Sequence, residues 1–186
     1  HALIPAAILR LAWKLFGGGD VLVKVSGIRF SISDGITTLH TNLIEGNFPD
    51  VDVIIPRKAK LVIELDAVEL QRAMQVMLAC QKANDDVPIC HFEIIQDNHG
   101  DIQIAGTTKR GGEYAISVNL RGSLITQDPE FKFPFNIAVN AGFICDVAAR
   151  IAGRVQIGFN ASNTPIIMRP VTQDNELTAV VMPMRI

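Results

Sequence analysis

Few residues in this chain could perform covalent or metal chemistry, and their spacing does not suit it. Cys90 and His91 are neighbours in a predicted strand, so their side chains point to opposite faces and cannot act together. Cys145 and Asp146 are neighbours on a predicted helix, with no histidine nearby in the sequence. The other histidines within the chain, His40 and His99, lack partners at metal-ligand spacing. We therefore expect no catalytic residue, no metal and no cofactor.

The charged residues are more informative, because they are distributed unequally between the predicted helices and the rest of the chain. The chain has 17 Lys and Arg against 19 Asp and Glu, a net charge of −2. The three predicted helices carry more positive than negative side chains: Arg10, Lys14, Arg72, Lys82 and Arg150 against Glu69 and Asp146. The helices are thus net positive, and the remainder of the chain is net negative.

The spacing of the positive residues places several of them on shared faces. Arg10 and Lys14 are four residues apart, as side chains on one helix face are. Arg150 and Arg154 repeat this spacing in the third helical region. A basic helix face in an acidic chain suits the phosphates of duplex DNA, through weak, salt-dependent contacts that read no bases. An ordinary solvent-exposed helix face is the alternative interpretation.

The composition is that of a globular protein with one large or two small domains. The chain has 186 residues and is 48% hydrophobic, which is enough for a core. Its three cysteines, Cys80, Cys90 and Cys145, form no C-x-x-C pair, which favours a reducing, cytoplasmic compartment. No apolar run approaches the ~20 residues of a membrane-spanning helix, and the first residues lack signal-peptide features. Because the chain begins with His1 and not Met, we expect a fragment.

Hydrophobic periodicity predicts one order of elements three times over. The first copy has a strand at 1–4, a helix at 6–16 and strands at 21–25, 28–33 and 36–43. An extended connector at 47–56 follows. The second copy has a strand at 60–65, a helix at 67–83 and strands at 89–96, 101–107 and 113–119. The third has a strand at 135–139, a helix at 141–152 and strands at 155–159, 165–169 and 177–182. Three β-α-β-β-β units predict an α+β fold with helices on one face of antiparallel sheets.

The last residues form a short apolar tail. Pro183 ends the final strand, because proline cannot donate to a sheet ladder. Met184 and Ile186 then flank a single charge, Arg185. Since the methionine side chain is flexible and polarizable, this tail is suited to form one wall of a groove that binds several partners.

Three segments resemble the bacterial DNA polymerase III β subunit, the β sliding clamp. They are the ending Val-Val-Met-Pro-Met-Arg-Ile at 180–186, the run Leu-Ile-Glu-Gly-Asn-Phe-Pro-Asp at 43–50 followed by Pro56, and Phe-Asn-Ile-Ala-Val-Asn at 135–140. The chain departs from the family pattern at three positions where tyrosine, arginine and tyrosine are frequent: Val51, Val53 and Phe143.

The resemblance implies a DNA-clamp fold, in which two such units form a domain and two three-domain chains close into a ring. Residues 1–56 would then be the second half of the middle domain, and 57–186 the third domain. It also implies a non-catalytic processivity factor that encircles double-stranded DNA in the cytoplasm, at the nucleoid. Replicative polymerase, clamp loader and repair proteins would bind through linear motifs of the Gln-x-Leu-x-Leu/Phe type, and the intact protein would be a homodimer.

The resemblance further assigns residues to three surfaces. The partner-peptide groove would contain Pro49, Val53, Ile54, Asn140, Phe143, Thr164, Met182, Pro183, Met184, Arg185 and Ile186. The DNA-facing side chains would be Arg10, Lys14, Arg72, Lys82, Arg150 and Arg154. The ring-closing interface would contain Ala79 and Cys80.

Two alternatives stay open at this point. The chain could be a peptide-binding scaffold of the same fold that does not tether DNA, of phage or plasmid origin. Single apolar residues such as Ile54 and Met182 could equally be ordinary core. Trp13, between Arg10 and Lys14, could contact DNA or pack under a loop.

Overall fold

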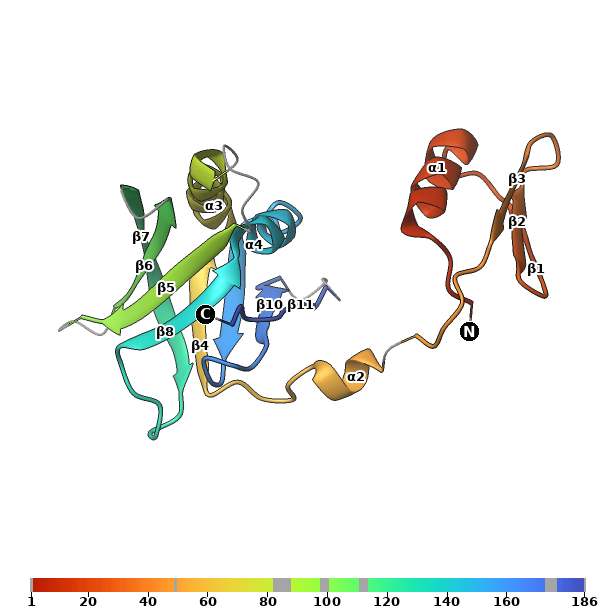
Figure 1. The fold of residues 1–186 in the computed structure, drawn as a ribbon. Helices are drawn as coiled ribbons and strands as arrows, with labels where there is room; N and C mark the ends of the chain where they lie inside the picture. The colour runs from red at the N-terminus through yellow and green to blue at the C-terminus, as the bar shows by residue number, and fades with distance from the viewer. Residues whose placement is uncertain are drawn as a thin grey trace. The chain divides into compact units, whose positions relative to one another are not determined.

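The computed structural model describes residues 2–48, 50–81, 88–97, 101–110, 114–172 and 177–185; at 80, 81, 108–110, 114 and 115 it describes the backbone alone. The chain divides into two compact units, residues 1–51 (unit 1) and 52–186 (unit 2). The division falls within a single helical turn, α2 (Val51–Ile54), whereas the family resemblance implied a boundary after Pro56. Figure 1 shows both units and their elements. No helix in the described ranges has the length and apolar character needed to cross a membrane.

Unit 1 consists of one helix and a three-stranded antiparallel sheet. Its elements are α1 (Ala6–Phe16), β1 (Leu22–Ser26), β2 (Arg29–Ser33) and β3 (Thr38–Asn42), and the strands lie in chain order. Ala12, Phe30 and Ile32 are its buried side chains among the described residues. The strand predicted at 1–4 is wrong for the described residues 2–4, although the Leu3 carbonyl accepts a hydrogen bond from the Ile44 N–H (2.8 Å).

Local sequence signals explain the ends of α1 and the turn after β2. Pro5 precedes α1 with φ −58°, a value that proline favours. Gly17 ends α1 at φ 61°, a left-handed conformation that glycine adopts without strain. In the β2–β3 turn, Asp34 Oδ1 accepts hydrogen bonds from the N–H groups of Thr37 (2.6 Å) and Ile36 (2.9 Å). These backbone donors lower the pKa of Asp34.

Unit 2 contains two copies of the predicted β-α-β-β-β order. The first copy is β4 (Leu61–Asp66), α3 (Ala67–Gln81), β5 (Ile89–Gln96), β6 (Ile102–Arg110) and β7 (Tyr114–Gln127). The second is β8 (Phe135–Asn140), α4 (Ala141–Ala148), β9 (Arg154–Phe159), β10 (Ile166–Pro170) and β11 (Ala179–Val181). The strands form one antiparallel sheet in the order β11-β10-β9-β4-β7-β6-β5-β8. The copies interlock, because β4 pairs with β9 and β5 pairs with β8.

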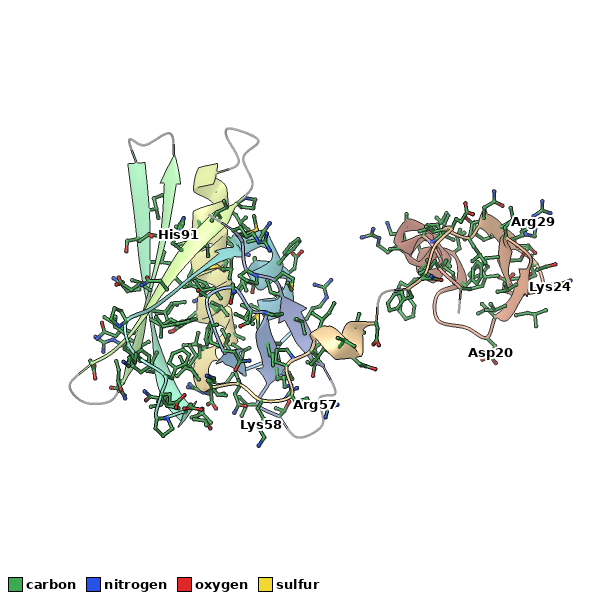
Figure 2. All side chains as sticks on the ribbon, turned by 60° about the horizontal axis from the view of Figure 1, so that its bottom comes forward. Asp20, Lys24, Arg29, Arg57, Lys58 and His91 are labelled. Carbon is green, nitrogen blue, oxygen red and sulfur yellow. The ribbon has the colours of Figure 1, made fainter. Side chains whose placement is uncertain are left out.

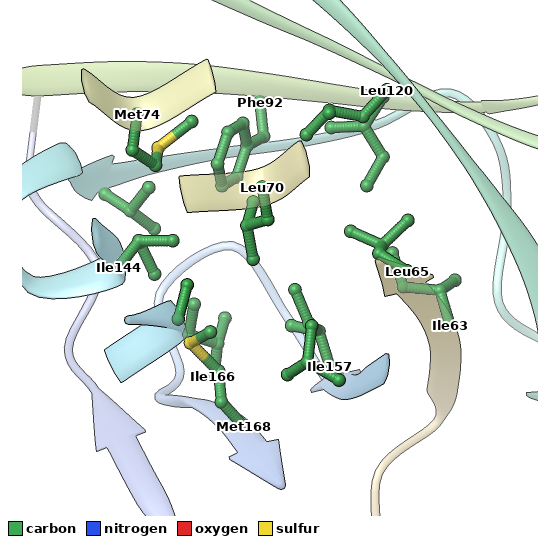
Figure 3. Close-up of a cluster of buried hydrophobic side chains, with 14 of the residues drawn as sticks. Ile63, Leu65, Leu70, Met74, Phe92, Leu120, Ile144, Ile157, Ile166 and Met168 are labelled. Carbon is green, nitrogen blue, oxygen red and sulfur yellow. The ribbon is translucent and has the colours of Figure 1, made fainter. Parts of the chain in front are cut away.

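The two helices of unit 2 and its sheet enclose one apolar core. α3 packs against α4, and α3 contacts β4, β6 and β7 while α4 contacts β8 and β11. Along β4, Leu61, Ile63 and Leu65 are buried at alternate positions, as expected for a strand with one face on a core. Figure 3 shows side chains from α3, α4 and several strands meeting there, among them Leu70 and Ile144. The α+β fold predicted from the repeats is therefore confirmed.

Besides the strand predicted at 1–4, three parts of the chain differ clearly from the sequence prediction. β7 continues to Gln127, where the strand had been predicted to end at 119. α4 ends at Ala148 and not at 152, because the chain turns so that Ile151 enters the core. The connector predicted as extended contains the helical turn α2. The predicted helix end near 83 lies outside the described residues.

Candidate partner-binding and DNA-facing surfaces

The C-terminal tail of unit 2 lies beside β8. After β11, the backbone N–H of Met184 donates a hydrogen bond to the carbonyl of Ala138 (2.8 Å), a residue of β8. This bond extends the sheet by a short segment next to its outermost strand. Met182 is exposed, whereas Pro183 and Met184 are half-buried and Arg185 is exposed. The tail therefore presents apolar side chains at the surface while its backbone is hydrogen-bonded to β8.

A hollow of about 240 Å³ borders this tail. Its walls come from the tail, from β5 and β8, and from the loop after β9: Met184, His91, Phe92, Asn136, Ile137, Ala138 and Ser162. Figure 2 labels His91 on its strand. Met184 is the residue that this hollow shares with the groove predicted from the sequence.

The residues predicted at the start of the last helix also have local roles. Asn140 Oδ1 accepts hydrogen bonds from the N–H groups of Gly142 (2.8 Å) and Phe143 (3.4 Å), so Asn140 caps α4. Phe143 is 59% exposed in the first turn of α4. Since Met184 pairs with Ala138, two residues before Asn140, the structure brings the tail and the start of α4 together. Thr164 is half-buried, and its hydroxyl bonds to the backbone of Ala161.

The connector residues of the predicted groove lie on α2. Val53 is 79% exposed, and Ile54 is also exposed. Neither side chain is core, which was the alternative for Ile54. Pro49 and Ile186 lie outside the described residues, so their places in the groove stay predictions.

The positive residues of α1 and α3 are on the surface. Arg10 and Lys14 are exposed on α1, and Arg72 is exposed on α3. Arg150 is exposed but not helical, contrary to the prediction, because α4 ends two residues earlier. Its Nη1 donates to the Asp146 carbonyl (2.7 Å), which places a positive charge at the carboxyl end of α4. Lys82 lies outside the described residues.

Arg154 differs from the others because it has a charged partner. It begins β9, so the helical spacing predicted for Arg150 and Arg154 is wrong. Its guanidinium forms an ion pair with the carboxylate of Glu64 on the neighbouring strand β4. Much of the Arg154 charge is therefore neutralised within the protein.

The residues predicted at a ring-closing interface lie at the end of α3. Ala79 is exposed there. The side chain of Cys80 lies outside the described atoms. Their role in an interface stays a prediction.

The cysteine and histidine side chains that could perform chemistry are separated as the strand alternation predicts. Cys90 is buried, and burial raises the pKa of its thiol to about 12, while His91 faces the surface hollow. Burial and the nearby Asp146 carboxylate raise the pKa of Cys145. In the described part of the chain, no three His, Cys, Asp or Glu side chains are grouped as a metal site requires.

One surface of unit 1 escaped the sequence analysis. A hollow of about 670 Å³ lies over the sheet face formed by β1, β2 and β3. Lys24, Ser31 and His40 form one row across the three strands, and Ser31 Oγ lies 2.8 Å from His40 Nδ1. Figure 2 shows Lys24 and Arg29 on these strands. The signal in the sequence was polar side chains at alternate positions of adjacent predicted strands.

Comparisons with known proteins connect this fold to one group of structures. No protein-family model and no curated protein matches the chain. Among solved structures, the DNA polymerase III β chain of Streptococcus pneumoniae aligns with the whole chain at 18% identity, a TM-score of 0.81 and 47% coverage of its own length. The sliding clamp of Bartonella birtlesii bound to griselimycin also aligns with the whole chain. Its sequence identity is 18%, its TM-score is 0.80, and 47% of its own length is covered. The β subunit of Thermotoga maritima has 21% sequence identity and a TM-score of 0.69. That alignment covers 89% of this chain and 42% of the Thermotoga chain.

These likenesses establish the fold. The chain has the fold of part of a DNA polymerase III β sliding clamp, as the sequence resemblance predicted. It spans about half the length of the structures that it matches.

Proposed function

We propose that this chain, which has the fold of about half of a β sliding clamp, is the C-terminal part of a DNA processivity factor. Residues 1–56 would be the second half of a middle domain, and 57–186 a third domain. The intact protein would be a homodimeric ring in the cytoplasm, at the nucleoid, that encircles duplex DNA and performs no chemistry. The observation that carries this proposal is the likeness of the whole chain to clamps from several organisms.

The surface around the tail supports a peptide-binding role within this function. Phe143 and Met182 are exposed and apolar, and Met184 borders a hollow. Asn140 caps the helix that carries Phe143, and the exposed Arg185 follows Met184 in the chain, so both add polar groups to this surface. An apolar slot with few polar groups suits an extended peptide anchored by leucine and phenylalanine. We propose that linear motifs of replicative polymerase, clamp loader and repair proteins bind here, with Val53 and Ile54 of α2 completing the groove.

The exposed positive residues support contact with duplex DNA. Arg10, Lys14 and Arg72 are on helices, and Arg150 follows one. Such side chains would attract phosphates without reading bases, as a sliding protein requires. Arg154 would contribute less attraction, because Glu64 already pairs with it.

The groove is tested by peptide binding to the 186-residue chain. A fluorescein-labelled Gln-x-Leu-x-Leu/Phe peptide is expected to bind, and griselimycin, which is bound in the similar Bartonella clamp, is expected to compete with it. Met182→Ala and Phe143→Ala should each weaken the peptide Kd by about tenfold, the effect of removing one apolar anchor. Ile36→Ala, which removes an exposed side chain in the β2–β3 turn of unit 1, is the matched control. Equal affinity in all four proteins would refute the groove assignment.

A peptide-binding scaffold without DNA tethering is the second candidate function. The observation that favours it is the thin positive surface, with Arg154 paired to Glu64 and Arg150 bonded to a backbone carbonyl. The two candidates differ in salt dependence. Tethering predicts that duplex affinity of the chain falls steeply as salt rises. A scaffold predicts peptide binding with no measurable duplex binding at any salt concentration.

A further inference from the structure

Trp13 is the only tryptophan in the chain, and it lies on the surface of unit 1. Its side chain is 73% exposed on α1, next to the buried Ala12. Tryptophan has a large apolar surface and is usually well buried on average. An indole that stays in solvent on a regular helix is therefore available for contact with another molecule.

The turn after α1 supports one edge of the indole. The Gly17 N–H donates to the Trp13 carbonyl (3.1 Å), and the indole Cη2 lies 3.8 Å from the position that a Cβ on Gly18 would occupy. The ring thus rests beside the glycine turn at its tip. Its exposure shows that most of the ring surface remains open.

The charges around Trp13 are all positive within its helix. Arg10 precedes it by three residues and Lys14 follows it directly, and α1 has no acidic residue. No ion pair forms at either cation among the residues that the structure describes. An exposed aromatic ring with two unneutralised cations on the same helix matches nucleic acid, which offers base faces and phosphates together.

The position of Trp13 can be compared with the corresponding position of α3. When the helices of the repeats are aligned so that Arg10 matches Arg72, Trp13 falls at the position of Gln75 in α3. α3 packs on α4, yet Arg72 and Gln75 are both exposed. In α3, the position that corresponds to Trp13 is thus in solvent although two repeats have joined.

We propose that Trp13 stacks on an unpaired base of single-stranded DNA, while Arg10 and Lys14 hold the neighbouring phosphates. Bases inside a duplex are covered by their neighbours, so the indole gains stacking only where a strand is single. Base–aromatic stacking tolerates any sequence, which suits a protein that reads none. The inference rests on the proposed function in one respect, namely that α1 belongs to the DNA-facing surface.

The unique tryptophan makes the test direct. The 186-residue chain is titrated at low salt with a short oligothymidylate and with a short duplex, while tryptophan fluorescence is followed. Strong quenching by the oligothymidylate and weak quenching by the duplex are expected. Binding is measured independently by the anisotropy of fluorescein-labelled DNA. In the anisotropy measurement, Trp13→Ala should weaken oligothymidylate binding by about tenfold and leave duplex binding unchanged. Trp13→Phe should weaken oligothymidylate binding less than Trp13→Ala does.

The variants separate this inference from the proposed function. Ile36→Ala, which removes a similarly exposed apolar side chain outside α1, should bind both DNAs as the parent does. Oligothymidylate binding that survives Trp13→Ala, or equal quenching by both DNAs, would overturn the stacking. Loss of single-strand affinity in Trp13→Ala, with duplex binding absent in the parent, would support the stacking and count against DNA tethering. Binding of neither DNA would overturn both.

Discussion

Unit 1 and unit 2 are built from the same repeat but bury very different amounts of apolar surface. Unit 2 joins two repeats around one core that extends from Leu61 to Val181. Unit 1 has one repeat, whose described core is Ala12, Phe30 and Ile32. One helix on three strands therefore encloses only a small core, whereas two such groups enclose a large one.

The edge strand β1 carries exposed apolar side chains on the core face of its sheet. Val23 pairs with Ile32 and Val25 with Phe30, so both valines share the core face of the sheet. They are nevertheless 53% and 51% exposed. In unit 2, the strand that follows each helix pairs with the first strand of the other repeat. The open edge of β1 is the corresponding position, which supports the proposal that unit 1 is half of a domain.

The largest expected difference between the units is in core truncation. Phe159 is fully buried in unit 2. Phe159→Ala should lower the unfolding free energy of unit 2 by about 3–5 kcal/mol. The midpoint of urea unfolding should therefore move to a lower urea concentration when it is followed by far-UV circular dichroism, to which unit 2 contributes most. Tryptophan fluorescence reports unit 1 through Trp13 and should not shift.

The reciprocal variant is the control for that experiment. Phe30→Ala should move the fluorescence transition and leave the dichroism transition of unit 2 in place. If either variant moved both transitions together, the two units would unfold as one, and the comparison would fail.

A pair of valines on corresponding strands sharpens the comparison. Val155 on β9 is fully buried and Val25 on β1 is half-exposed. Val155→Ala should lower the unfolding free energy of unit 2 by about 2 kcal/mol, the contribution of a buried valine. Val25→Ala should cost unit 1 less than about 1 kcal/mol. Equal losses from the two would show that β1 is covered in solution.

Alkaline pH should destabilise unit 2 through Cys90, while unit 1, which contains no cysteine, lacks this effect. Burial raises the thiol pKa from 9.0 to about 12. Below pH 9 the thiol is protonated in both the folded and the unfolded state. Between pH 9 and about 12 only the unfolded thiol ionises, so stability falls as pH rises, by ~1.4 kcal/mol at pH 10.

Cys90→Ala should reduce that dependence in urea unfolding measured at pH 8 and pH 10. Since Cys145 shifts in the same direction, a smaller slope remains. A variant with the full slope of the parent would refute the assignment to Cys90.

The smallest effect concerns the helix caps. Asn140 caps α4, so Asn140→Ala should cost about 1 kcal/mol of unit 2 stability. Asn140→Asp keeps an accepting oxygen and should cost little. α1 has no side-chain cap, since Pro5 precedes it. Peptide affinity that falls in Asn140→Asp, with stability retained, would show that the amide itself contacts the partner.

The local parts of this fold were predictable from the sequence, and the long-range parts were not. The bounds of α1 and β5 match the prediction, because proline, glycine and hydrophobic spacing act within a few residues. The end of β7 was missed because Gly122 resembles a turn signal. In the structure, a Cβ there would collide with Leu65 Cδ2, so Gly122 permits close packing within a continuing strand.

In the candidate surfaces, too, local features were predictable and contacts between distant segments were not. Exposure of Arg10, Lys14 and Arg72 followed from helix periodicity. The ion pair of Arg154 with Glu64 could not be predicted, because it depends on β9 and β4 becoming neighbours across 90 residues of chain. The Met184 bond to Ala138 was missed for the same reason.

The pairing of β4 with β9 has a consequence for synthesis of this protein. β4 leaves the ribosome early in unit 2, but one of its two edges finds no partner until β9 emerges, 90 residues later. Contacts between such distant segments form slowly, because the entropy cost of closing a long loop comes before the contacts stabilise the chain. During that interval an apolar strand is open to pairing with other nascent chains. The speed of translation from β4 to β9 thus sets how long the unfinished protein must avoid aggregation.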